Sequence, residues 1–368
     1  MRPYQALCLI GAVPILLIGS AIAGPASRQS VTKLTEAADA IVTGSVEAMS
    51  SNGIVTASVG VERVLKGAVI QGSTVSLLWN SPPSGLPYGP GRITRGHGIF
   101  FMREGATGLL TLLPATGGDV SWEETYIPTA AAVPPDIASL AASSLPPNPS
   151  VLDKVLVEIV SAREAGGSVP VDLIETFRES HSQVLAAAFG RFRSRQDPSL
   201  ASLGLWGLIA TGDASTILAV RQNYVSLSSR PFWGSMIEEI KRYYLNTDLG
   251  AIRVLGETAT DSGVGIDLRI ATGAALGRMH TQQTLPYLAK LLDDENLTLK
   301  TIGVGGLSSF ANNVLANSHQ MAPGDWKYRT EDTVAHSAFD ENLVRSRESY
   351  YADFWRNWWQ LNQSILAR

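Results

Sequence analysis

The spacing of apolar residues changes once along the chain, and this change constrains the fold more than any other feature. Before residue 130 apolar side chains alternate with polar ones, as in β-strands that bury one face. After residue 150 they recur with the helical period. Residues 130–150, rich in Ala, Pro and Ser, separate the two patterns as a linker or packed connector. We therefore expect an α+β multidomain protein with a β part followed by a helical part.

The first 23 residues have the pattern of an export signal. Arg2 precedes an apolar run from Ala6 to Ala23, which ends in the small-x-small triplet Ala21-Ile22-Ala23. This order of charge, apolar core and cleavage site is typical of a secretory signal peptide over residues 1–23. We therefore expect an exported chain, periplasmic or extracellular, that meets the membrane only through this segment. An uncleaved N-terminal anchor is the alternative.

The composition narrows the classes of function. With 45% hydrophobic and 17% charged residues, the chain can bury enough apolar surface to fold. Its net charge is -4 and it has no run of Lys and Arg, so nucleic acid is not an expected partner. The single cysteine, Cys8, lies in the leader. The exported chain is therefore expected to lack disulfides, thiolate metal sites and cysteine nucleophiles.

Residues 32–129 are expected to form a small all-β domain. Two β-branched runs, 40–46 and 54–64, flank Asn52-Gly53, a pair that favours a hairpin turn. The second run alternates apolar and polar residues, which predicts one buried and one exposed face. Further strands are expected at 74–79, 98–102 and 109–113. Short strands at this spacing are typical of a closed or half-closed barrel.

Two strings in this region, 38–46 (ADAIVTGSV) and 61–67 (VERVLKG), resemble the OB-like barrel of the netrin and metalloproteinase-inhibitor kind. The resemblance implies an OB-like fold for the β domain alone. Inhibitors of that family act through an N-terminal cysteine and are tied by disulfides. Because the exported chain is expected to have neither, the resemblance does not imply protease inhibition.

Residues 151–322 are expected to be a series of paired helices. Leu208 and Leu276 occupy similar places in two such pairs and are 68 positions apart, which is two steps of about 34, a spacing found in helical repeats. Helices are expected over 151–165, 171–180, 182–193, 198–210, 214–224, 232–245, 266–278, 282–293 and 297–311.

The clearest stretch, 267–307, resembles HEAT repeats. It has a first helix rich in small residues, a turn, and a second helix that ends in Leu291-Leu292-Asp293 before a new first helix begins. The resemblance implies an armadillo-type solenoid, in which each pair buries its apolar side against its neighbours and the stack offers a concave surface to partners.

Residues 323–368 are expected to be a polar loop followed by an aromatic helix. Residues 351, 354, 355, 358 and 362 share one face of that helix, so much of its aromatic mass can be buried together. We expect a helix that caps the last repeat. A docking surface for a partner or a glycan, which would use Trp355 and Trp359, is the alternative.

The motifs of common active sites are missing from the sequence. The five histidines form no His-Glu-x-x-His pair, and neither a Gly-x-Ser-x-Gly elbow nor a Walker loop occurs. We therefore expect no catalytic, cofactor-binding or metal-binding residues. The long loop over 82–97 is the best candidate for partner contact in the β part, through Tyr88, Arg92, Arg95 and His97. A plain surface loop is the alternative.

These features predict a non-catalytic, exported scaffold whose HEAT-like surface binds another envelope or secreted protein. The alternative is a hydrolase or a carbohydrate-binding or carbohydrate-active envelope protein. Its site would be assembled in three dimensions from scattered carboxylates and aromatic residues. The sequence leaves the oligomeric state open.

Overall fold

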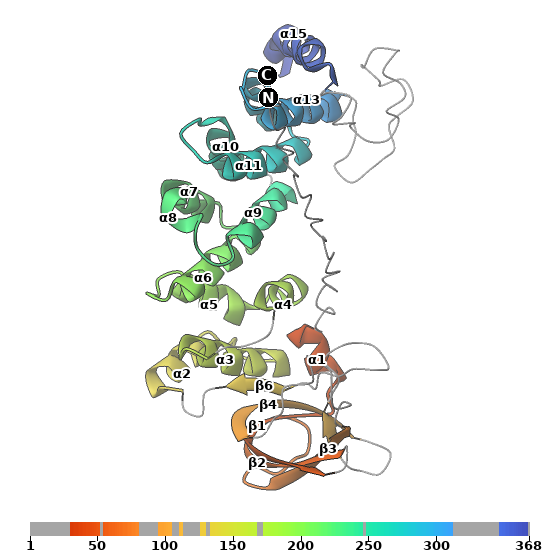
Figure 1. The fold of residues 1–368 in the computed structure, drawn as a ribbon, viewed down its shortest axis with the longest axis vertical. Coiled ribbons are helices and arrows are strands. Elements are labelled where there is room, and N and C mark those ends of the chain that lie inside the picture. Colours follow the sequence, from red (N-terminus) through yellow and green to blue (C-terminus); the bar gives the residue numbers. More distant parts are fainter. Residues whose placement is uncertain are drawn as a thin grey trace, which may run out of the picture.

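The computed structural model describes residues 30–51, 54–80, 95–104, 110–112, 126–129, 133–167, 172–245, 248–311 and 346–366. The described part is mostly helical, with a small curled sheet near its N-terminal end. Figure 1 shows the strands at one end of a long molecule and the helices following one another along its long axis. The expected α+β class is confirmed at this level.

The strands of the described part join into one sheet whose order is β1-β2-β3-β5-β4-β6, and β1 also pairs with β4. Hydrogen-bonded pairing therefore runs in a ring through β1, β2, β3, β5 and β4, and β6 pairs with residues 97–100 of β4. The β3–β5 pair is parallel and the others are antiparallel. The strands are β1 (Ala40–Ser51), β2 (Ile54–Lys66), β3 (Thr74–Asn80), β4 (Arg95–Glu104), β5 (Leu110–Leu112) and β6 (Tyr126–Thr129).

The predicted hairpin and the alternation in β2 are confirmed. β1 and β2 pair antiparallel outward from Ser51 opposite Ile54. In β2 the apolar residues Ala57, Val59 and Val61 are buried, while their polar neighbours face outward. The buried side forms a core inside the curled sheet with residues of β1, β3 and β4.

The N-terminal edge of the region expected to be an all-β domain, residues 32–129, is a helix, which corrects the expectation that this region holds strands alone. Helix α1 (Val31–Ala37) begins at Ser30, whose Oγ accepts a hydrogen bond from Lys33 N at 3.3 Å. Val31 and Leu34 are buried against β4, α3 (Val151–Glu164) and α4 (Leu173–Ser180). Seven residues are too few to show a helical period, so the sequence pattern did not reveal this helix.

The β part and the first helices share one hydrophobic core. Ile41, Ile99 and Phe101 point away from the interior of the sheet and are buried with residues of α1, α3, α4 and α5 (Gln183–Phe192). Two polar contacts cross the same boundary: Lys66 Nζ donates to Thr35 O at 2.8 Å, and Arg63 pairs with Glu158. The two parts are therefore joined by packing as well as by the chain.

The region expected to be a linker or packed connector, residues 130–150, holds a helix. Helix α2 (Pro135–Ala142) packs on α3, and its Ala141 is fully buried. Helix α3 begins with a capping box, in which Ser150 Oγ accepts from Asp153 N and Asp153 Oδ2 accepts from Ser150 N.

The remaining helices match the expected ranges with two omissions, the short helix α8 (Tyr224–Leu227) and helix α10 (Leu249–Thr260). Helix α10, which contacts α7, α11 and α12, was not predicted. The elements are α5 (Gln183–Phe192), α6 (Pro198–Ala210), α7 (Ala214–Gln222), α8 (Tyr224–Leu227), α9 (Trp233–Lys241), η1 (Tyr243–Leu245), α10 (Leu249–Thr260), α11 (Ile266–Arg278), η2 (Gln282–Thr284), α12 (Leu285–Leu291), α13 (Leu297–Ala311) and α15 (Glu348–Leu366).

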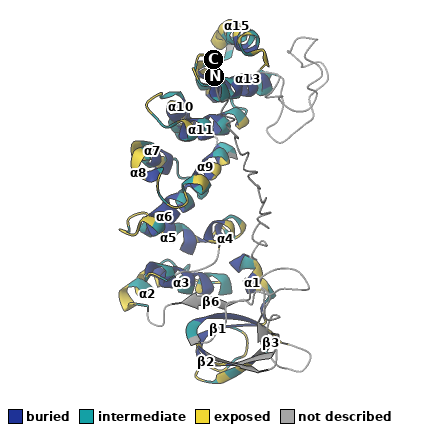
Figure 2. Ribbon diagram, in the orientation of Figure 1, coloured by how far each residue is buried: buried dark blue, intermediate teal, exposed yellow. Residues whose placement is uncertain are grey.

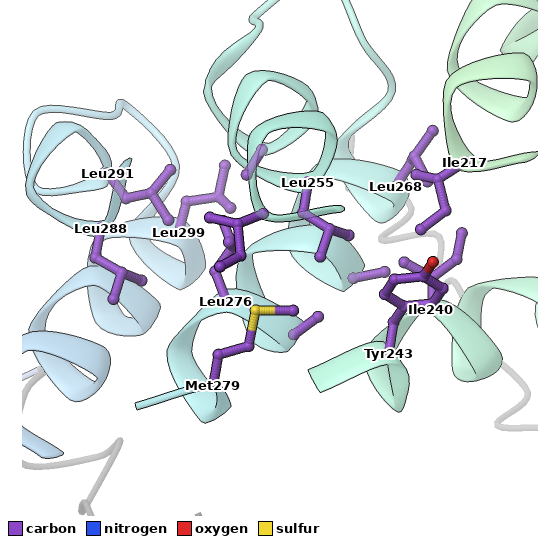
Figure 3. Packing of buried hydrophobic residues seen from close by; sticks show 14 of the residues in the cluster. Ile217, Ile240, Tyr243, Leu255, Leu268, Leu276, Met279, Leu288, Leu291 and Leu299 are labelled. Carbon is purple, nitrogen blue, oxygen red and sulfur yellow. The ribbon is translucent and has the colours of Figure 1, made fainter. Parts of the chain in front are cut away.

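From α6 onward the contacts between helices form two rows. One row runs α6, α9, α11, α13 and the other runs α7, α10, α12, α15, and each helix contacts the next in its row. Between the rows lies one continuous core, whose middle section contains Leu255, Leu276 and Leu288 (Figure 3). Figure 2 shows buried residues on the facing sides of these helices and exposed residues at their ends and turns.

Helix α15 covers the end of the stack. It contacts α12 and α13, and its Tyr351 and Trp355 are buried in the same core. Phe354, Trp358 and Trp359 are partly buried against it. The shared aromatic face predicted for this helix is thus the face that packs on the stack.

Candidate functional site

The C-terminal ends of α4, α6, α9 and α11 lie around a common hollow of about 590 Å³. Its lining includes Phe177, Arg178, Glu239, Arg242, Tyr244 and Arg278, and we call it the basic groove. Three of these helices, α6, α9 and α11, belong to one row of the stack.

One acidic residue of the groove is already neutralised. Glu239 pairs with Arg178 and also accepts a hydrogen bond from Trp206 Nε1 at 3.3 Å. Arg178 bonds in turn to Glu175 at 2.8 Å. Burial opposes the charge on Arg178, but the two carboxylates outweigh that effect and raise its pKa. Glu239 therefore serves as a fixed counter-ion for Arg178, which disfavours a role as a general base.

Two other arginines of the groove are free of carboxylate partners within the described ranges, so they can bind an added anion. Arg242 and Arg278 are exposed, and within the described ranges neither forms an ion pair with another residue. Arg278 lies over the ring of Tyr244, with its Cζ 5.7 Å from the ring centre. Cations near helix C-termini offset the negative end of the helix dipole, which accounts for arginines at these positions. Their exposed guanidinium groups can also bind carboxylates.

The floor of the groove is aromatic and fixed. Tyr243 is buried, and its hydroxyl donates to Gly212 O. Phe177 packs edge-on against the ring of His181 at 5.8 Å. His181 ends α4 with a positive φ of 49°. An aromatic floor beneath exposed guanidinium groups suits a ligand that carries both an apolar part and negative charge.

The residues predicted from the loop over 82–97 are placed as follows. Tyr88 and Arg92 lie outside the described residues, and Arg95 begins β4. His97, in β4, lies with its Nε2 2.8 Å from Glu62 Oε2, and its side chain is only 10% exposed. Ser45 Oγ also donates to Glu62, at 3.0 Å. Burial would raise the pKa of Glu62, but the bonds from His97 and Ser45 outweigh it and lower the pKa. His97 thus joins β1, β2 and β4 at the sheet surface.

The two predicted tryptophans have different surroundings. Trp355 is fully buried in the core under α15. Trp359, one turn further along the helix, is partly exposed and lines a second hollow of about 540 Å³ beside the start of α12. Only Trp359 of this pair reaches a surface in this structure.

A third hollow, of about 300 Å³, lies between β2, α2 and α3. Arg63 and Glu158 line it and pair with each other, and burial raises the pKa of Glu158 despite the neighbouring guanidinium. The carboxylates in this hollow and in the basic groove therefore each have a cationic partner. Across the ranges that the structure describes, no three His, Cys, Asp or Glu side chains come close enough to hold a metal ion.

The sequence reasoning did not single out the residues of the basic groove. They lie on four helices and become neighbours only through the packing of the stack. One signal was present in the sequence, because Arg178, Arg242 and Arg278 each fall at the C-terminal end of an expected helix. That pattern alone indicates only a favourable interaction with the helix dipole.

No protein-family model matches this chain, and neither the curated proteins nor the solved structures gave a match. None of the helices in the described ranges combines the length and the apolar character needed to span a bilayer.

Proposed function

We propose that this chain is an exported, non-catalytic scaffold that binds a segment of another envelope or secreted protein in the basic groove. The observation that carries the proposal is the pair of exposed arginines, Arg242 and Arg278, beside fixed aromatic rings in a protein of net charge -4. A concentrated positive surface on an acidic protein favours a negatively charged partner.

The proposed architecture is an OB-like barrel followed by a HEAT-like solenoid with a capping helix. The ring of pairing through β1, β2, β3, β5 and β4, with β3 parallel to β5, supports the barrel. The two rows of helices, each in contact mainly with near neighbours along the chain, support the solenoid. A solenoid presents the ends of consecutive helices along one side, which is where the basic groove lies.

The partner segment is proposed to be acidic and to contain an aromatic or other apolar side chain. Two carboxylates can bind the guanidinium groups of Arg242 and Arg278, and the apolar side chain can pack beside Tyr244. Such contacts combine a desolvated anchor with charge pairs, as in many protein interfaces.

The binding proposal is tested with synthetic peptides in which Glu residues flank one Trp, measured by fluorescence anisotropy on the full chain. Arg242→Ala with Arg278→Ala is expected to weaken binding at least about tenfold, and added salt is expected to weaken binding to the wild-type chain. The matched control is Arg253→Ala with Lys290→Ala, which removes the same charge from exposed positions outside the groove. Equal losses in the two double variants would show that general charge, and not the groove, binds the peptide.

Export is tested separately by cell fractionation and by the mass of the recovered protein. The leader is expected to be removed after Ala23, so the mature chain begins at Gly24. Recovery of the full-length chain only in the cytoplasm would contradict the proposed location without affecting the groove.

A further inference from the structure

A second hollow lies at the opposite end of the helical stack from the β part, where α15 packs beside η2 and α12. Its volume is about 540 Å³, and we call it the terminal hollow. Gln282, Gln283 and Pro286 line it from η2 and α12, while Trp359, Gln363 and Ser364 line it from α15. A volume of this order is usual for small-molecule sites.

The described side chains that line the terminal hollow are uncharged and include both polar and apolar residues. Three glutamine amides and one serine hydroxyl supply both hydrogen-bond donors and acceptors. Within the described part of the chain, no hydrogen bond to protein engages these four side chains. The basic groove, in contrast, is lined by arginines. The chemistry of the terminal hollow therefore favours a neutral ligand with many hydroxyl or amide groups.

Trp359 adds an apolar platform to this polar lining. Tyr351, Trp355 and Trp359 are spaced four residues apart, so they form a row along α15. The first two are buried and complete the core, whereas Trp359 is partly exposed where the row meets the hollow. An indole face beside amide groups matches a molecule with one apolar face and a rim of hydroxyl groups.

We infer that the terminal hollow is a binding site for a neutral carbohydrate. A sugar ring has an apolar face of C–H groups that can lie on the indole of Trp359. Its hydroxyl groups can exchange hydrogen bonds with the amides of Gln282, Gln283 and Gln363. The lining holds no charged side chain among the described residues, which favours a neutral sugar over a charged one. This site goes beyond the proposed binding of a protein segment in the basic groove.

The inference is tested by titrating the full chain with neutral oligosaccharides of different linkage: cellopentaose, maltopentaose, xylopentaose and chitotetraose. Binding is followed by calorimetry and by tryptophan fluorescence. At least one oligosaccharide is expected to bind at millimolar or lower concentration. Trp359→Ala is expected to weaken that binding about tenfold or more, and Gln363→Ala to weaken it less. Trp359→Phe, which keeps a ring, is expected to recover part of the affinity.

The matched control is Leu361→Ala on the same helix, because Leu361 is 76% exposed and does not line the hollow. Circular dichroism of each variant shows whether α15 remains folded. The inference is overturned if no oligosaccharide binds, or if Leu361→Ala weakens binding as much as Trp359→Ala. Preferential binding of a polyproline peptide over every oligosaccharide would also overturn it. The Arg242→Ala and Arg278→Ala variant should bind the sugar normally, so failure at one site does not imply failure at the other.

Discussion

Glu164, the last residue of α3, is joined to Arg191 of α5 by two parallel hydrogen bonds. Arg191 Nε donates to Glu164 Oε1 and Arg191 Nη2 donates to Glu164 Oε2, each at 3.2 Å. Arg195 adds a further bond to Oε1 at 3.1 Å. The Glu164 side chain has no exposed surface, so its charge is stabilised wholly by these guanidinium groups. This ion pair holds α5 against α3, the helix that contacts β2 and β6.

Glu164→Ala is expected to destabilise the protein by about 3 kcal/mol, because it leaves two guanidinium groups without their buried partner. Urea unfolding followed by circular dichroism measures the change. Glu238→Ala is the control, since its pair with Lys241 is 61% exposed on the Glu238 side and should contribute less than about 0.5 kcal/mol. Similar losses in the two variants would contradict the role assigned to Glu164.

Close contact between α5 and α6 depends on Gly204. A Cβ placed on Gly204 would lie 2.8 Å from Phe189 O and equally near the carbonyl carbon of Phe192. Backbone atoms cannot move aside as a flexible side chain can, so Gly204→Ala is expected to cost about 3 kcal/mol. A Cβ placed on Gly190, within α5, would have no neighbouring atom inside 4 Å, so Gly190→Ala should stabilise by about 0.5–1 kcal/mol.

Gly204→Ala is expected to lower the free energy of unfolding and Gly190→Ala to raise it. This difference separates the effect of contact between helices from the effect of helix propensity. Thermal unfolding of both proteins under one condition gives the comparison. A gain of stability in Gly204→Ala would show that α5 and α6 can separate at little cost, and would contradict their close packing.

The sequence predicted those parts of the fold that repeat a simple period. The alternation in β2 was correct because that strand buries one face. Most helices were predicted over nearly the ranges that they occupy. Helix α10 was missed because Gly250, Gly256 and several β-branched residues lower its intrinsic helix propensity. Its Ala251, Ile252 and Leu255 are nevertheless buried, so packing against α7 and α11 stabilises it.

The candidate sites were harder to predict from the sequence than the fold was. Phe177 and Arg278 line one groove although 101 positions separate them in the chain. The sequence shows each as part of a helix, but only the stacking of α4, α6, α9 and α11 brings them together. Trp359 was identified because three tryptophans occur close together, yet the glutamines beside it carry no local pattern.

Asp213 gives the stability of the stack a dependence on pH. It precedes α7, where its Oδ1 accepts from Ser215 N at 3.0 Å and its Oδ2 accepts from Thr216 Oγ1 at 2.9 Å. Burial would raise the pKa of Asp213, but these hydrogen bonds outweigh it and lower the pKa. A lowered carboxyl pKa adds stability above the ordinary value of about 3.9 and loses it as the pH falls through the folded value.

Asp213→Ala is therefore expected to cost about 1 kcal/mol at neutral pH, as for other helix caps. The difference from the wild-type chain should shrink as the pH falls below the ordinary carboxyl value of about 3.9, because the carboxyl is protonated first in the unfolded and then in the folded chain. Urea unfolding of both proteins over this range measures it. A difference that grows on acidification would have the wrong sign for a lowered pKa.

Trp355 and Trp359 are expected to respond differently to truncation, although they lie one turn apart on α15. Trp355 is fully buried beside Tyr351 and Trp358, so Trp355→Ala should create a cavity and destabilise by about 3–5 kcal/mol. Trp359 is only partly buried, so Trp359→Ala should cost less than about 2 kcal/mol. Limited proteolysis and urea unfolding measure both effects. If Trp359→Ala destabilised the chain as much as Trp355→Ala, Trp359 would be a core residue, and a loss of sugar binding in that variant would reflect unfolding of α15.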